Sequence, residues 1–262
     1  MGERETTVDN LNACYDSILA LGTGLDEAGW ATQSLCPDWN VQQLFGHLAG
    51  VETAMDGMAP TEEMPADFFA SVGQYTNDAG TKAPAEVLAD LTAVIDRRRE
   101  QLGALDDPTF DAPCFTPVGP QTYGRFLAVR VFDFWVHEQD CRIPLNQPGH
   151  LEGGAAAQAL DEVHRSLGYI IGKKAGAPDG SRVTLDVTGE PGRTMHVAID
   201  GRAAVVDTLD DSTVTVTADH QAFLMLACGR VDPQAMIDAG RVSWSGDTAL
   251  GEQIARNLAF TM

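Results

Sequence analysis

Hydrophobic residues recur at intervals of three or four over the first 175 residues, which is the spacing of amphipathic helices. The pattern predicts five helices, at 8–25, 39–58, 84–102, 123–141 and 151–173, with a short helix near 68–74 inside a polar loop. From residue 176 the period changes to two, which is typical of half-buried strands. Strands are predicted at 182–189, 193–200, 212–219 and 241–246, and helices at 219–228, 232–239 and 247–258.

This change of period predicts an α+β fold with two domains. Residues 1–175 are expected to form an up-down helical bundle, and residues 176–262 a small α/β domain. The segment 174–179, which is rich in small and polar residues, is the predicted boundary.

The helix at 123–141 carries the candidate chemistry. Asp133 and His137 are four residues apart, so their side chains stack on one face. Asp133 falls within an apolar stripe, where an unpaired carboxylate would cost several kcal/mol. The stripe consists of Phe126, Val129, Phe132, Val136 and Ile143.

His47 flanks the apolar face of the helix at 39–58 and is the candidate partner of Asp133 and His137. Two imidazoles and one carboxylate that point into a bundle predict a metal site with open positions. The alternative is an intrahelical pair in which His137 alone satisfies Asp133.

Several neighbours of these residues are further candidates. Arg130 lies next to the same face and is a candidate for binding an anionic ligand, or for pairing with Asp133. Glu138 and Asp140 are candidate hydrogen-bond acceptors that would orient the imidazoles. Cys36, which precedes a proline in a loop, is a candidate reactive thiol.

Composition narrows the choice of partners. The chain has 38 acidic and 17 basic residues, a formal net charge of −21, which argues against nucleic acid or an anionic membrane as partner. Its five cysteines are widely spaced and form no C-x-x-C motif, so we expect a reducing, cytoplasmic environment. There is no signal-peptide pattern and no uninterrupted run of 18 apolar residues. Serine hydrolysis and nucleotide binding lack their usual motifs.

Three stretches resemble one known family. WNVQQLFGHLAGVE, RVFDFWVHEQDCR and the tail VSWSGDTALGEQIARNLAFTM are similar to the mycothiol-dependent maleylpyruvate isomerase family. The resemblance covers nearly the whole chain. It implies a DinB-like metal-binding bundle followed by a sterol-carrier-like domain.

The resemblance also implies specific ligands. The two histidines of the family match His47 and His137, and the carboxylate position, which is Glu in the founding isomerase, is Asp133 here. The family implies a divalent metal, usually Zn²⁺, with mycothiol as co-substrate. It also uses an arginine from the C-terminal domain near the substrate, for which Arg230 and Arg241 are candidates.

The hypothesis is therefore an enzyme that binds a small-molecule substrate and a low-molecular-weight thiol. A metal-coordinated thiol loses its proton, and the thiolate is a nucleophile for cis–trans isomerisation or for thiol S-transfer. Two alternatives stay open: a non-catalytic binding protein for a lipid or other small molecule with a structural metal, and a metal-dependent hydrolase. The substrate pocket is expected between the two domains. The pattern does not indicate an oligomeric state.

Overall fold

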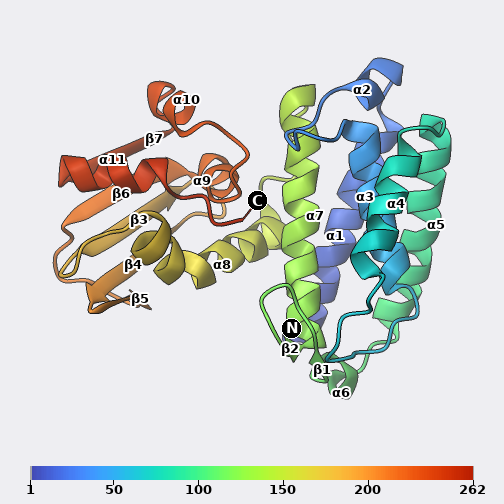
Figure 1. Cartoon of the computed structure of the whole chain (residues 1–262), viewed down its shortest axis with the longest axis horizontal. Helices are drawn as coiled ribbons and strands as arrows, with labels where there is room; N and C mark the ends of the chain where they lie inside the picture. Colours follow the sequence, from blue (N-terminus) through green and yellow to red (C-terminus); the bar gives the residue numbers. More distant parts are fainter. Residues whose placement is uncertain (1, 262) are drawn as a thin grey trace. The chain divides into compact units, whose positions relative to one another are not determined.

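Four long helices form a bundle in the computed structural model, which describes residues 2–261 (Figure 1). They are α1 (Glu3–Thr23), α3 (Val41–Met55), α5 (Pro84–Gly103) and α7 (Tyr123–Leu145). Helices α1 and α3 each pack against both α5 and α7, so every bundle helix has two neighbours. The predicted α+β fold, a helical bundle followed by a small α/β domain, is confirmed.

Shorter elements connect the bundle helices. Helix α2 (Glu27–Ala31) follows α1, and α4 (Phe68–Ala79) packs against α3. Helix α6 (Asp107–Phe110) precedes an antiparallel ribbon of β1 (Pro113–Cys114) and β2 (Gln121–Thr122). The sequence did not predict α2 and α6, because helices of five and four residues are too short to show a period.

Hydrogen bonds at the helix ends move two predicted boundaries. The sequence placed the start of α3 at Trp39, whereas Asn40 caps the helix. The side chain of Asn40 accepts from the backbone N–H of Gln43 at 2.9 Å, and the Gln43 side chain accepts from the N–H of Asn40 at 3.1 Å. Helix α7 continues beyond its predicted end and includes Pro144 in its last turn.

The apolar stripe predicted for α7 is not its fully buried face. Val129, Phe132 and Ile143 are partly exposed, whereas Phe134 is fully buried. The ring of Phe134 packs edge-to-face on Tyr15 of α1, with centroids 5.1 Å apart. Burial extends around most of α7, at 14 of its 23 residues, so one stripe cannot be identified from the sequence.

The second unit is a five-stranded sheet with helices packed against it. The strand order is β5–β4–β3–β6–β7, with β3 and β6 parallel and the other pairs antiparallel. Alternate residues of β3, β4 and β6 are buried, as the period of two predicted. The strands are β3 (Arg182–Thr188), β4 (Arg193–Asp200), β5 (Arg202–Val206), β6 (Val214–Asp219) and β7 (Val242–Gly246). The sequence missed β5, a mostly exposed edge strand whose burial does not alternate regularly.

The helices of this unit lie close to their predicted ranges. Helix α8 (Gly153–Tyr169) continues into a π-helical turn, η1 (Ile170–Lys174). It is followed by α9 (His220–Ala227), α10 (Pro233–Asp238) and α11 (Thr248–Arg256). Asp247 caps α11, since its carboxylate accepts from the N–H of Leu250 at 3.0 Å.

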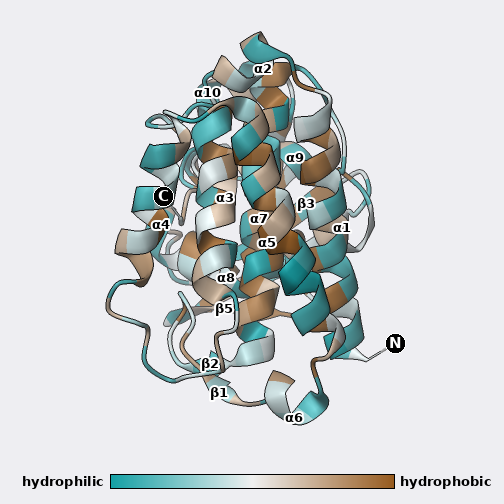
Figure 2. Ribbon diagram, turned by 90° about the vertical axis from the view of Figure 1, so that its right-hand side faces the viewer, coloured by the Kyte–Doolittle hydropathy of each residue, from teal (hydrophilic) through white to brown (hydrophobic). Residues whose placement is uncertain are grey.

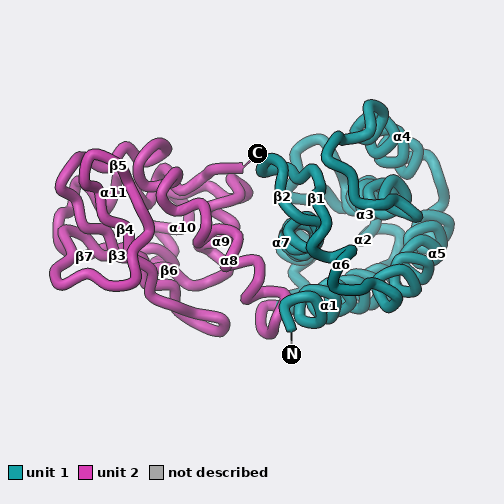
Figure 3. The backbone as a smooth tube through the Cα atoms, turned by 90° about the horizontal axis from the view of Figure 1, so that it is seen from below, with its two compact units in different colours: residues 1–150 teal, residues 151–262 magenta. Residues whose placement is uncertain are grey.

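The chain divides into compact units at residues 1–150 and 151–262 (Figure 3). The sequence placed this boundary at 175/176, and so assigned α8 to the bundle. Helix α8 instead packs against β4, β5 and α9, which makes it part of the second unit. Its regular helical period is shared with the bundle helices, and this is why the pattern alone assigned it there.

Hydrophobic and hydrophilic residues alternate along α3 and α5, the pattern of helices with one face toward a core (Figure 2). Within residues 2–261, no helix is both long and apolar enough to span a bilayer.

Candidate metal centre

Two helices bring the three predicted ligand residues together. His47 lies on α3, and Asp133 and His137 lie one turn apart on α7, which packs against α3. One ligand atom from each residue lies within 4.8 Å of the others. The imidazole rings meet edge-to-face with centroids 4.9 Å apart, and His137 Nε2 lies 3.5 Å from Asp133 Oδ1. Two ring nitrogens and one carboxylate oxygen, atom types that can bind a metal ion, therefore lie close together.

Trp39 completes the wall around His47. Its indole stacks on the His47 imidazole, with centroids 4.7 Å apart and an interplanar angle of 27°. Trp39 directly precedes the Asn40 cap of α3, so the capping hydrogen bonds hold the indole beside the ring. The start of α3 thus places an aromatic ring against His47.

The surroundings favour a positive charge between the two carboxylates. Burial and the neighbouring His137 lower the pKa of His47 to about 3, so this imidazole is neutral at pH 7. Burial alone would lower the pKa of His137, but Asp133 and Asp140 raise it to about 10. Burial alone would raise the pKa of Asp133, but Arg130 and the two histidines lower it to about 2.

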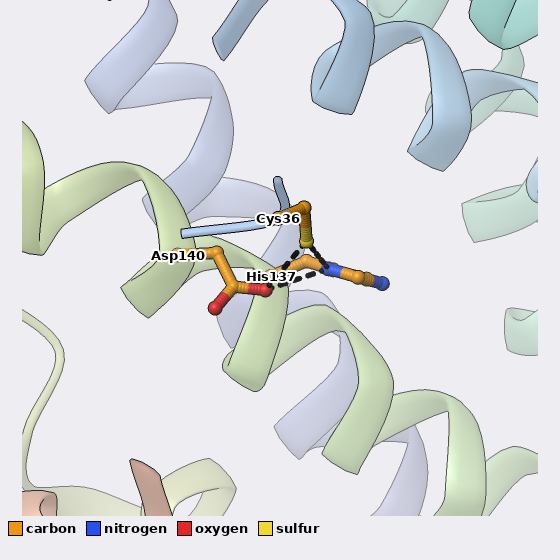
Figure 4. Close-up of side chains that lie close together, drawn as sticks. All are labelled: Cys36, His137 and Asp140. Carbon is orange, nitrogen blue, oxygen red and sulfur yellow. Dashed lines mark hydrogen bonds and ion pairs between the residues drawn. The ribbon is translucent and has the colours of Figure 1, made fainter. Parts of the chain in front are cut away.

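The second ring nitrogen of His137 is held from behind. Its Nδ1 lies 3.0 Å from Asp140 Oδ2 and 3.8 Å from Cys36 Sγ, and the thiol lies 3.3 Å from the same carboxylate oxygen. Figure 4 shows Cys36 and Asp140 meeting one ring nitrogen while the other nitrogen points away from them. When the ring is neutral, Asp140 therefore favours the tautomer with the proton on Nδ1, which leaves the Nε2 lone pair available to a metal ion. Cys36, His137 and Asp140 also form a second group with metal-ligating atoms.

Glu138 does not take the orienting role that the sequence also suggested for it. Its buried carboxylate binds other groups of the first unit: His150 Nδ1 at 2.7 Å, Arg142 Nε at 2.5 Å and Ser17 Oγ at 2.5 Å. Of the two candidates, Asp140 alone contacts a predicted ligand.

A cavity of about 460 Å³ opens beside the predicted ligands. His47, Asp133 and Arg130 lie in its wall, and the rest of the lining is mainly apolar. The sequence placed Asp133 in a core, but its side chain is 32% exposed, because it faces this cavity. A ligand in the cavity can reach the site.

Comparison with known proteins decides the family. Residues 11–142 match the Mycothiol maleylpyruvate isomerase N-terminal domain, and residues 157–253 match the MDMPI C-terminal domain. The chain belongs to the mycothiol maleylpyruvate isomerase family. The resemblance noted in the sequence is confirmed.

The chain is similar to two uncharacterized proteins in sequence and to solved isomerase structures in fold. It is 28% identical over 141 residues to the uncharacterized proteins MT0041 and Rv0036c of Mycobacterium tuberculosis. The match covers 51% of the chain and 54% of each relative, so the chain spans about half the length of these curated relatives. Among solved structures, a histidine-to-alanine mutant of the mycothiol-dependent maleylpyruvate isomerase superposes with a TM-score of 0.64, and the unmutated isomerase with 0.62. Their sequence identities are 16% and 15%, and each match covers 94% of this chain and 93% of the other. These superpositions establish a shared fold.

The sequence did not point to Glu52, a fully buried carboxylate of α3. Its Oε1 lies 3.0 Å from Arg130 Nη2, and its Oε2 lies 2.9 Å from Arg98 Nε and 2.7 Å from the Tyr15 hydroxyl. Arg130 also pairs with Asp133, so Glu52 is tied to the site through one guanidinium. A glutamate between buried Val51 and Met55 is the signal that would have indicated it.

The two arginines predicted near the substrate belong to the second unit. Arg241 pairs with Asp219, with Nη2 2.6 Å from Oδ1 and Nε 2.8 Å from Oδ2. Arg230 donates from Nη1 to the carbonyl oxygen of Cys228 at 3.1 Å. Both arginines thus have hydrogen-bond partners within the second unit.

Proposed function

We propose that the chain is a metal-dependent enzyme that uses mycothiol, a low-molecular-weight thiol, to attack a small electrophilic substrate. The observation that carries the proposal is the convergence of His47, Asp133 and His137 within 4.8 Å at the wall of a cavity. Membership of the family supports the thiol and an isomerase-like reaction.

The donor set fits a divalent metal. Two imidazoles and one carboxylate are ligands that Zn²⁺ binds, and three protein ligands leave a position open for a further group. His47 is already neutral, and Asp133 is ionised at pH 7. A bound metal ion would replace the positive charge that His137 carries between Asp133 and Asp140. We take Zn²⁺ as the first metal to test.

Each neighbouring side chain has a part in this proposal. A bound divalent metal supplies the charge that lowers the pKa of a coordinated thiol. Asp140 holds the His137 ring with Nε2 toward Asp133. Arg130 neutralises Asp133 in part and keeps that carboxylate in place. Arg230 and Arg241 are proposed substrate-binding residues of the second unit.

Two reactions share the first step. The thiolate adds to an electron-poor double bond, which leaves a single bond that can rotate. Loss of the thiolate then gives cis–trans isomerisation, whereas protonation of the adduct and release with the sulfur attached gives S-transfer. Consumption of the thiol distinguishes the two.

Because all five cysteines are thiols, we also propose a reducing, cytoplasmic location.

The test is metal content after loading with Zn²⁺ and removal of excess. We expect about one ion per chain in the wild type, and little in His47→Ala and Asp133→Ala, because each substitution removes one of three ligands. His164→Ala is the matched control, since this histidine lies on α8 of the second unit, and it should retain the ion.

A folded wild type that takes up neither Zn²⁺ nor Ni²⁺, Fe²⁺ or Mn²⁺ would contradict the proposal. So would uptake that is equal in all four proteins. Circular dichroism of each variant separates loss of a ligand from loss of the fold.

A further inference from the structure

The cavity beside the metal centre is lined by a chain of aromatic rings. Phe68 lies edge-to-face with Phe69 at 5.6 Å and with Phe115 at 5.9 Å between centroids, and Phe115 lies edge-to-face with Phe126 at 5.2 Å. All four rings line the cavity, and they come from α4, from the segment after β1 and from α7. This apolar wall is built from three separate parts of the chain.

Glycines on α3 let α4 reach this position. A Cβ at Gly50 would lie 2.7 Å from Tyr75 Cβ, and one at Gly46 would overlap Ala79. The two helices therefore approach more closely than side chains would allow. This close packing at the middle and end of α4 fixes the helix whose first residues, Phe68 and Phe69, border the cavity.

Away from His47, Arg130 and Asp133, the lining of the cavity offers a ligand few hydrogen-bond partners. Thr116 is the polar residue there, and its hydroxyl already donates to the carbonyl of Gly119 at 2.6 Å and accepts from the N–H of Val118 at 3.2 Å. A hydrophilic ligand would lose hydrogen bonds to water and regain few of them, which is unfavourable for each polar group left unpaired.

The charge of the cavity also disfavours a dianion. Among the residues that the structure describes, Arg130 is the one Lys or Arg side chain in the lining, and it is engaged by Glu52 and Asp133. A second carboxylate of a ligand would therefore lie against phenylalanine and valine side chains. The net charge of −21 adds a repulsive field for anions in solution.

Two exposed apolar side chains line the mouth of the cavity. Phe69 is 68% exposed and Met64 is 44% exposed, although both line the cavity. Large apolar side chains grouped at the rim of a hollow are typical of ligand-binding sites. They would be covered in part by a ligand that enters between them.

We propose that this cavity receives the uncharged, apolar body of an unsaturated carbonyl compound, an aromatic one by preference, with its polar end at His47 and Asp133. This inference rests on the proposed function for the chemistry at the polar end. What it adds is the class of substrate, an uncharged and apolar one. A dicarboxylate belongs to a different class, because the aromatic wall offers no partner for a second carboxylate.

The test is competition against an uncharged fluorescent probe, N-phenyl-1-naphthylamine, bound to the metal-free wild-type chain without thiol. Methyl cinnamate and maleate are the competitors, because both carry an α,β-unsaturated carbonyl but only the ester is apolar and uncharged. We expect methyl cinnamate to displace the probe at concentrations at least about tenfold lower than maleate, a difference of about 1.4 kcal/mol.

Two variants locate the bound probe. Val129→Trp fills the cavity from α7 and should weaken probe binding by at least about tenfold. Phe69→Ser removes an exposed ring at the mouth and should weaken it by a smaller factor. Tyr169→Ser is the matched control, because Tyr169 is 53% exposed and lines a separate cleft in the second unit. It should leave the affinity unchanged.

Displacement by maleate as effective as by the ester would overturn the inference. Binding that Val129→Trp leaves intact, in a variant with a wild-type circular dichroism spectrum, would overturn it as well. Since neither metal nor thiol is present, these results are independent of the metal-loading experiment. If the probe binds but the chain takes up no metal, the apolar site is supported and the proposed function is contradicted.

Discussion

The two units differ in where their arginine–carboxylate ion pairs lie. In the first unit the ion pairs of Glu52 with Arg98 and Arg130 are almost completely hidden, with side-chain exposures of 0%, 2% and 6%. In the second unit, the described ion pairs between arginine and a carboxylate all lie at the surface, and the pair of Arg241 with Asp219 is 37% exposed on each side. Buried ion pairs therefore accompany the proposed metal centre and the cavity.

This difference indicates what each unit is built to hold. Removing charges from water is expensive unless they are paired and hydrogen-bonded, so a fold does not accumulate them in a core by hydrophobic packing alone. In the first unit they form one connected set, from Arg98 through Glu52 and Arg130 to Asp133. We infer that this set orients Asp133, and the second unit has a more conventional apolar core.

The largest effect should follow from breaking that set at its centre. Glu52→Gln leaves the two arginines buried with no carboxylate between them, and loss of one partner of a buried pair costs about 3–5 kcal/mol. We expect the first unit to lose about 3 kcal/mol or more of its free energy of unfolding. Hydrogen exchange of peptides from α1, α3, α5 and α7 measures this unit separately from the sheet.

Asp90→Asn is the control in the same unit. Asp90 pairs with Lys82 at the surface, with side-chain exposures of 46% and 38%, and such pairs contribute about 0–1 kcal/mol. Equal losses in the two variants would contradict the claim that buried pairing organises the first unit.

A smaller effect should appear in the dependence of stability on pH. Burial alone would raise the pKa of Glu52, but Arg130 and Arg98 lower it below the ordinary value of 4.5. The folded chain then binds fewer protons than the unfolded chain in this range, so stability rises with pH. The contribution is complete above pH 4.5 and is lost as the pH falls through the lowered pKa.

Wild type and Glu52→Gln should therefore converge in acid. Urea unfolding at a series of pH values between about 7 and 3 measures the difference between them, which we expect to shrink below the ordinary pKa of glutamate. A difference that stays constant, or that grows as the pH falls, would show that the Glu52 carboxylate is not held ionised by its partners.

The contrast between the units also explains which features the sequence predicted. Asp133 and His137 share one helix, where a spacing of four residues determines their relative position. His47 was identified from its place beside the apolar face of its own helix, and the family resemblance supported it. Glu52 and Arg98 are 46 residues apart on different helices, and no periodic pattern links them. The cavity was likewise not predicted, because its wall combines residues from α3, α4, α7 and the connections between helices.

The same reasoning applies to the second unit. Its alternating strands were predicted because alternate burial follows directly from the geometry of a sheet. The edge strand β5 and the position of α8 were not, since both depend on which elements pack together. Local periodicity predicts where a helix or strand lies in the sequence. Which other helices and strands it packs against depends on contacts between distant segments of the chain.

The smallest effect should come from the surface charges of the second unit. Asp219 is half-exposed, but besides pairing with Arg241 it caps α9, where its Oδ1 accepts from the N–H of Ala222 at 3.0 Å. Asp219→Ala should therefore lower the free energy of unfolding of the sheet by about 1 kcal/mol, the usual loss for a removed helix cap. Asp200→Ala is the matched control, since Asp200 pairs with Arg182 at 3.0 Å.

Asp200 is 71% exposed, so its removal should cost no more than about 0.5 kcal/mol. Hydrogen exchange of peptides from β3, β4 and β6 measures both variants. A loss in Asp219→Ala as large as that in Glu52→Gln would remove the contrast between the units, because a surface carboxylate would then stabilise the sheet as strongly as a buried one stabilises the bundle. Equal, small losses in Asp219→Ala and Asp200→Ala would instead show that the cap adds nothing to the ion pair. Only the intermediate result assigns the effect of Asp219 to the helix end, and it keeps the buried arginine–carboxylate pairs as a feature of the unit that holds the proposed metal centre.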